Sequence, residues 1–266
     1  MRAILAVVFV AVVIVSVAAA GAAEEKTGAG EPAKVTAPPE PERMVRIFNG
    51  KDLTEWDGAP DLWSAKDGVI RGETTKEHPA KGNTFLIWKG GTPADFELRL
   101  SYRMEKGNSG IQYRSKHLKD AKENAWVVSG YQAEVANEPG RAGFLYHERG
   151  RGRVCMVGEQ VVMEAGAKKN EGKKNVVGSV GDPKAIAATY KLNDWNDYII
   201  IAKGNHIVHY LNGVQTIDFT DNDENGRAMS GIIALQIHTG PPMWVEFKDI
   251  RLKQFGTGDA PKAEQK

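Results

Sequence analysis

Alternation of apolar and polar residues is the feature that most restricts how this chain can fold. In FELRLSYRM, residues 96–104, every second side chain is apolar, which is typical of a strand with one face in a core and one in water. Similar short stretches follow, separated by turn residues such as Asn212-Gly213, a dipeptide typical of tight hairpins. No long stretch has the period of a helix. The sequence therefore predicts an all-β protein of short antiparallel strands, a sandwich or jelly roll.

The alternating stretches are confined to residues 44–255, which we expect to form one domain. Residues 24–43, rich in Pro, Glu, Ala and Lys, predict a disordered linker, and residues 256–266 predict a disordered tail. Residues 1–23 have the form of an export signal, because Arg2 precedes an apolar run that ends in small residues. We expect a periplasmic or extracellular protein; the alternative is that the run is kept as a membrane anchor.

Charge and cysteine content narrow the classes of partner. The chain has 35 Lys and Arg against 34 Asp and Glu, a net charge of +1. This balance favours neither nucleic acid nor an anionic membrane surface as a partner. Cys155 is the single cysteine, so an intramolecular disulfide is excluded and a buried free thiol is predicted. Nothing in the sequence predicts the oligomeric state.

Three of the predicted strands carry a pair of hydrogen-bonding side chains two positions apart. Because successive side chains of a strand point to opposite faces, the members of each pair share a face. Their planar groups suit paired hydroxyls or a carbonyl. If the strands lie in one sheet, six such groups form a binding site; the alternative is an ordinary solvated face. The pairs are Gln112 and Arg114, Gln132 and Glu134, and Gln236 and His238.

A fourth polar stretch is GFLYHERGRGR, residues 143–153. We expect it to form a rim that supplies an acid, a base or a substrate clamp to the polar face. The alternative is a basic surface loop, whose exposed ion pairs would contribute little to stability. Its functional candidates are Tyr146, His147, Glu148, Arg149, Arg151 and Arg153.

An ordered set of motifs resembles the 3-keto-disaccharide hydrolase domain family. The motifs are FNGKDLTEW, NSGIQYRS, GYQAEV, GFLYHERGR, LNDWNDYIIIAKGNHIVHYLNG, LQIHTGPPM and VEFKDIRLK, within residues 45–253. The resemblance implies a concanavalin A-like jelly roll whose concave sheet carries the polar pairs, and action on glycosides with a 3-keto sugar. Related sequences commonly have GYQAD and LYDE, so Glu134 replaces a shorter carboxylate and His147 replaces an acid.

The implied substrate favours elimination over direct displacement. A ketone at C3 acidifies the hydrogen on C2, so a base can remove it, the group at C1 then leaves, and water adds later. Glu134 or His238 is the candidate base, and Glu148 or Tyr146 is the candidate acid for the leaving oxygen. Arg114 is the candidate for stabilising the enolate oxygen. The candidates for orienting or clamping the sugar are Gln112, Gln132, Gln236 and Arg149.

Two alternatives stay open at this point. The same concave face without an acid and a base would make a carbohydrate-binding, lectin-like module of the cell envelope, and a purely structural envelope protein would bind no sugar. We predict no catalytic metal and no cofactor, because no close ligand spacing such as HExxH occurs. Structural calcium is the alternative, with oxygen and nitrogen ligands from Glu134, Glu148, His147 and His238.

Overall fold

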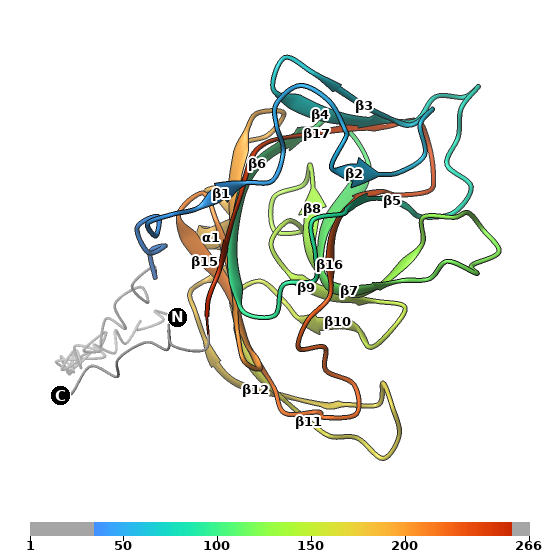
Figure 1. The fold of residues 1–266 in the computed structure, drawn as a ribbon. Helices are drawn as coiled ribbons and strands as arrows, with labels where there is room; N and C mark the ends of the chain where they lie inside the picture. Colours follow the sequence, from blue (N-terminus) through green and yellow to red (C-terminus); the bar gives the residue numbers. More distant parts are fainter. Residues whose placement is uncertain (1–34, 257–266) are drawn as a thin grey trace, which may run out of the picture. The chain divides into compact units, whose positions relative to one another are not determined.

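The computed structural model describes residues 35–256 of the 266-residue chain. These residues form two β-sheets that face each other as layers (Figure 1). The predicted all-β, concanavalin A-like jelly-roll sandwich is confirmed. The predicted export signal, the first part of the predicted linker and all but the first residue of the predicted tail lie outside the described residues.

The larger sheet contains ten of the strands within residues 35–256. Its order is β12-β11-β15-β14-β13-β6-β17-β4-β3, with β1 paired to β17. All its listed neighbours pair antiparallel except β11 and β15, which run parallel. The strands are β1 (Val45–Arg46), β3 (Trp63–Lys66), β4 (Val69–Glu73), β6 (Phe96–Met104), β11 (Glu159–Glu164), β12 (Lys173–Ser179), β13 (Asn196–Lys203), β14 (His206–Leu211), β15 (Val214–Asp221) and β17 (Trp244–Gln254).

The smaller sheet contains seven of the described strands in the order β10-β9-β8-β7-β16-β5-β2. It brings β7, β8 and β16, the three strands with polar pairs, next to one another. A short helix, α1 (Pro183–Ala187), follows the N-cap residue Asp182 and has proline in its first turn. The strands are β2 (Trp56–Asp57), β5 (Thr84–Trp88), β7 (Asn108–His117), β8 (Val128–Ala136), β9 (Leu145–Glu148), β10 (Gly152–Cys155) and β16 (Ile232–Ile237).

The core lies between the sheets and follows the predicted alternation. The apolar members of β6 are all buried and belong to the main core cluster: Phe96, Leu98, Leu100 and Tyr102. The predicted hairpin at Asn212-Gly213 joins β14 to β15, and both residues have positive φ as the tight turn requires. Cys155 is a buried free thiol, as predicted, and burial raises its pKa well above the usual range.

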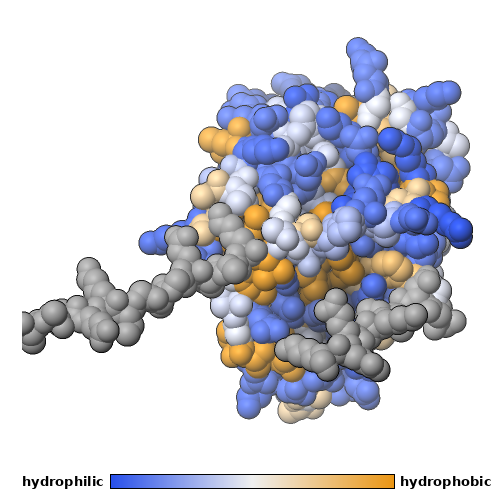
Figure 2. Space-filling view, turned by 90° about the vertical axis from the view of Figure 1, so that its left-hand side faces the viewer, coloured by the Kyte–Doolittle hydropathy of each residue, from blue (hydrophilic) through white to orange (hydrophobic). Residues whose placement is uncertain are grey.

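The outer face of the ten-stranded sheet is partly covered by residues 35–40. Ala37 donates its backbone N–H to Gly213 and packs against an apolar cluster on β13 and β14. The guanidinium of Arg99 donates to the carbonyls of Pro38 and Pro39. Ordered contacts thus begin before the expected domain boundary at residue 44. Figure 2 views the molecule from this side and shows apolar residues gathered between hydrophilic ones. In the described part of the chain, no helix has the length and apolar character needed to cross a membrane.

Candidate functional site

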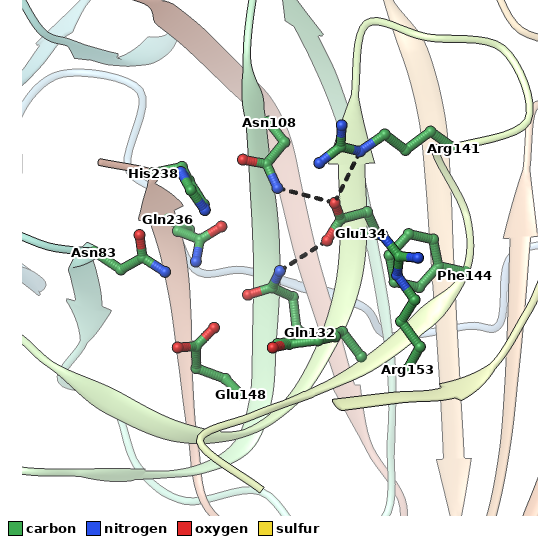
Figure 3. A pocket seen from close by; sticks show the side chains of 11 residues that line it. Asn83, Asn108, Gln132, Glu134, Arg141, Phe144, Glu148, Arg153, Gln236 and His238 are labelled. Carbon is green, nitrogen blue, oxygen red and sulfur yellow. Dashed lines mark hydrogen bonds and ion pairs between the residues drawn. The ribbon is translucent and has the colours of Figure 1, made fainter. Parts of the chain in front are cut away.

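A polar cavity of about 210 Å³ lies on the face of the seven-stranded sheet that points away from the core. Figure 3 shows its side chains pointing toward one another around an open centre. They come from β7, β8, β9, β10 and β16 and from the loops beside them. The lining residues are Asn83, Asn108, Gln132, Glu134, Arg141, Phe144, Tyr146, Glu148, Arg153, Gln236 and His238.

A chain of amide hydrogen bonds crosses from β7 to β8 and ends on a carboxylate. The hydroxyl of Ser115 donates to Gln112 Oε1, and Gln112 Nε2 donates to Gln132 Oε1 over 2.7 Å. Gln132 Nε2 then donates to Glu134 Oε2 over 2.9 Å. Each amide uses its oxygen on one side and its nitrogen on the other, so the carboxylate fixes the direction of the whole chain. Gln112 therefore lies behind the cavity wall and holds Gln132, which lines the cavity.

Glu134 is held by three groups at the wall of the cavity. Besides Gln132, Asn108 Nδ2 donates to its Oε1 over 3.0 Å, and Arg141 Nε lies 3.6 Å from the same oxygen (Figure 3). The residue is only 3% exposed. Burial raises the pKa of Glu134, and the hydrogen bonds from Asn108 and Gln132 offset part of this effect. A buried carboxylate with a raised pKa is a stronger base than a solvated one.

Strand β9 contributes the second carboxylate. Tyr146 and Glu148, two positions apart, both line the cavity, whereas His147 points to the opposite face. Burial raises the pKa of Glu148, against the opposing influence of Arg149 and His238. Burial also raises the pKa of Tyr146. Glu148 is thus a carboxyl group that holds its proton to higher pH than a solvated glutamate does.

Gln236 is the most unusual residue of the cavity. Its side chain is buried, at 1% exposure, yet neither Nε2 nor Oε1 has a hydrogen-bond partner among the described residues. Buried polar groups are nearly always paired, because an unpaired donor or acceptor costs about 1–3 kcal/mol. An amide that is shielded by the protein and faces a polar cavity has the arrangement of a ligand-binding group.

His238 follows β16 directly and lines the cavity opposite Glu134 (Figure 3). Its Nδ1 lies 2.5 Å from the carbonyl oxygen of Thr239. Because a carbonyl only accepts, Nδ1 carries the hydrogen. In the neutral ring, Nε2 is then a free acceptor that can take a proton.

Two of the predicted substrate-binding residues lie outside this cavity. The expectation that Arg114 shares a face with Gln112 is not met, because the pairing register shifts between Tyr113 and Lys116. Arg114 has φ +46°, is 1% exposed and binds Asp95 and three backbone carbonyls away from the cavity. Arg149 lies in the turn after β9 and pairs with Glu123 over 2.7 Å.

The four side chains considered for a metal site do not converge. His147 faces away from the cavity that Glu134, Glu148 and His238 line, and its Nδ1 accepts from Arg151 Nε. In residues 35–256, no group of three or more His, Cys, Asp or Glu side chains is placed to hold a metal ion.

Several lining residues were missed by the sequence analysis. Asn108 was detectable, because it lies on the same face of β7 as Gln112, four positions earlier. Phe144 likewise alternates with Tyr146. Asn83 and Arg141 come from loops, where no periodicity shows which side chains converge.

A second cavity of about 470 Å³ adjoins the first one. The two share Asn108, Arg141 and His238 in their walls, so a ligand larger than one sugar ring can extend from one into the other. The walls found only in the second cavity include Pro241 and Met243 beside the charged residues Lys106 and Glu138.

Comparisons with known proteins agree with this architecture. A candidate glycosyl hydrolase from Parabacteroides distasonis has a similar structure, with a TM-score of 0.50, 18% identity, and coverage of 80% of this chain and 100% of that chain. Carbohydrate binding module CBM66 from Bacillus subtilis matches with a TM-score of 0.47 and 16% identity over 78% of this chain and 99% of that one. A β-glucanase from Bacillus licheniformis matches with a TM-score of 0.46 and 11% identity over 79% and 96%.

No curated protein matches the sequence. A sequence model described as the 3-keto-alpha-glucoside-1,2-lyase-like domain matches residues 43–253, most of the chain and nearly all of the described sandwich. This match confirms the resemblance that the motifs indicated. The chain therefore belongs to the 3-keto-alpha-glucoside-1,2-lyase-like domain family.

Proposed function

We propose that this protein cleaves 3-keto-glycosides by removing the proton on C2 and expelling the group at C1, after which water adds to C1. The observation that carries the proposal is the unpaired, buried amide of Gln236 in a cavity that also holds two buried carboxyl groups with raised pKa values. Family membership supports the same chemistry.

In this proposal Glu134 is the base. It takes the C2 proton while the electrons of the C–H bond form the enolate, and the raised pKa makes the ionised carboxylate a better acceptor. The Nε2 of Gln236 replaces Arg114 as the candidate donor to the enolate oxygen, because it faces the cavity without a partner. Collapse of the enolate then breaks the bond between C1 and the leaving oxygen.

Glu148 is the proposed acid for the leaving oxygen, since burial favours its protonated form. His238 is the alternative for this role or for the base, because its Nε2 faces the cavity. The adjoining cavity would receive the leaving group. This mechanism needs no pair of carboxylates spaced for oxocarbenium chemistry.

The first experiment compares a chromogenic 3-keto-glucoside with its unoxidised parent, in both anomers, on the chain without residues 1–23. We expect release from the keto substrate only, with the 1,2-unsaturated sugar visible by NMR. Binding of sugars without release from either substrate would instead favour the lectin-like module. Cleavage of the parent as fast as the keto substrate would contradict the elimination route.

The assignment of Glu134 is tested separately. Glu134→Gln keeps the shape of the side chain but removes the base, so we expect kcat/KM to fall by about 10²–10⁴-fold with binding retained. Glu55→Gln, at an exposed position outside the cavity, is the matched control and should leave kcat/KM unchanged. Near-normal turnover by Glu134→Gln would remove this residue from the mechanism.

We also propose that the protein is exported, on the basis of the charged start, apolar run and small residues in positions 1–23. Expression with this segment should place the protein in the periplasmic fraction or the medium, with a new N-terminus near Ala22 or Ala23 by mass spectrometry. A cytoplasmic protein that keeps Met1 would contradict export.

A further inference from the structure

A second polar cavity, of about 230 Å³, lies beyond the end of β9 and differs from the first in its charge. Five cationic residues line it, and no Asp or Glu is among its lining residues: they are Arg114, Lys116, Arg149, Lys169 and Arg227, together with Ser129, His147, Asn170, Asn225 and backbone of Gly130, Gly226 and Ala228. We call it the basic cavity.

The irregularity of β7 is what places Arg114 in this wall. The register of β7 against β8 shifts between Tyr113 and Lys116, and Arg114 takes a positive φ of 46°. A bulge of this kind re-aims a side chain, and a positive φ at a non-glycine residue is seldom kept without a compensating contact. Here the guanidinium is fixed by four hydrogen bonds, three to carbonyls and one to Asp95.

The charges of the basic cavity are only partly compensated. Arg114, Arg149 and Arg227 each pair with a carboxylate at the periphery, namely Asp95, Glu123 and Glu224. Lys116 and Lys169 form no ion pair with any described residue. The cavity therefore has excess positive charge and ammonium groups that are free to turn toward a ligand.

His147 provides a second, independent feature. It is 6% exposed, and its Nδ1 accepts a hydrogen bond from Arg151 Nε over 3.1 Å. The hydrogen of the neutral ring is then on Nε2, and this donor has no partner among the described residues. Burial lowers the pKa of His147 to about 4, with Arg151 acting in the same direction, so the ring is a neutral donor at neutral pH. A buried donor without an acceptor, in a wall without carboxylates, fits an anionic ligand.

We propose that the basic cavity binds an oxyanion, a phosphate or sulfate group that is either free or carried on a glycan. The oxygens of such a group accept hydrogen bonds in several directions, which matches donors from the two lysines and the imidazole. Tyr146 and Glu148 line the first cavity, whereas His147 and Arg149 line the basic cavity. The two sites are separate, so this proposal does not depend on the proposed lyase activity.

Calorimetry with inorganic phosphate and with sulfate, at low ionic strength, tests the proposal on the chain without residues 1–23. We expect saturable binding that the double variant Lys116→Ala, Lys169→Ala weakens by about tenfold. The double variant Lys51→Ala, Lys66→Ala removes the same charge from exposed positions outside this cavity and should bind like the wild type. No saturable binding, or equal weakening in both double variants, would overturn the proposal.

The imidazole gives a readout that a general charge effect does not move. Titration with phosphate should shift the ¹⁵N resonance of His147 Nε2 in the wild type and in the control double variant. An unchanged His147 resonance under saturating phosphate would contradict the assigned site. A sulfated oligosaccharide that binds more tightly than inorganic sulfate would identify a glycan-borne group, and the reverse order a free ion; either result supports an oxyanion site.

Discussion

At the scale of single residues, Gln236 combines deep burial with an amide that the protein does not pair. Gln236→Leu keeps the approximate volume and removes the unpaired groups, so we expect the free energy of unfolding to rise by about 1–3 kcal/mol. The same change should abolish detectable sugar binding or turnover. This opposition of stability and function is typical of residues kept for a ligand. Urea denaturation and steady-state kinetics measure the two effects.

Gln112→Leu is the matched control for that prediction. Gln112 has the same side chain in the neighbouring strand, but both ends of its amide are paired, to Ser115 and Gln132. Its replacement leaves these partners unpaired and should lower the free energy of unfolding by about 1–3 kcal/mol. If both leucine variants changed stability in the same direction, the difference in pairing would not be what distinguishes the two glutamines.

Glu148 gives a prediction about pH. Burial raises its pKa in the folded state, so the folded protein binds this proton more tightly than the unfolded chain does. The resulting stability is fully present below the ordinary glutamate pKa of about 4.3 and is lost as pH rises through the raised value. Relative to wild type, Glu148→Gln should therefore gain stability between pH 4 and pH 8, as measured by denaturation at each pH. A difference that is flat with pH, or equal to that of Glu55→Gln, would contradict this account.

Single residues also show where sequence reasoning stops. The rule that residues two apart share a face located Gln132, Glu134 and Gln236 on the cavity side of the sheet. It failed for Arg114, because the register shift beside it is set by pairing with other strands and by nothing local to IQYRS.

At the scale of elements, the β7–β8 pair builds the base by leaving space for it. Gly110 lies directly opposite Glu134 in the pairing, and a Cβ on Gly110 would come within 2.2 Å of Gln132 Cδ. The glycine thus makes room for the amide that holds the carboxylate. Alternation alone did not identify Gly110 as part of the site, because its contribution is an absent side chain.

Gly110→Ala should consequently disturb the amide chain more than the fold. The atoms that a new Cβ would meet belong to the flexible Gln132 side chain, which can move, so we expect a modest loss of stability. Turnover should fall by about tenfold or more, because the hydrogen bond from Gln132 to Glu134 is displaced. Ala133→Gly, on the opposite face of the same pair, controls for general weakening of the strands. A Gly110→Ala variant with normal kcat/KM would show that Gln132 does not position the base.

At the scale of the whole molecule, alternation and turn residues were enough to predict the sandwich, because one apolar face per strand leaves few other ways to build a core. The order of strands was not predictable, since it depends on pairings between distant segments such as β11 with β15. The start of the ordered region was also misplaced. Proline-rich composition favours a linker, but the segment gains partners on a surface that only the finished sheet provides.

That segment gives the last prediction. Residues 35–40 bind the outer face of the ten-stranded sheet through the backbone of Ala37, the carbonyls that accept from Arg99, and the pair between Glu40 and Arg251. A chain that begins at residue 44 should have a free energy of unfolding lower by about 1–3 kcal/mol than one that begins at residue 24. A chain that begins at residue 34 keeps these contacts and should retain full stability. All three should share the same kcat/KM, because the candidate site lies on the other sheet. Equal stability of the three chains in urea would show that the segment contributes nothing to the fold, and a selective loss of turnover in the shortest chain would show that the two sheets are coupled.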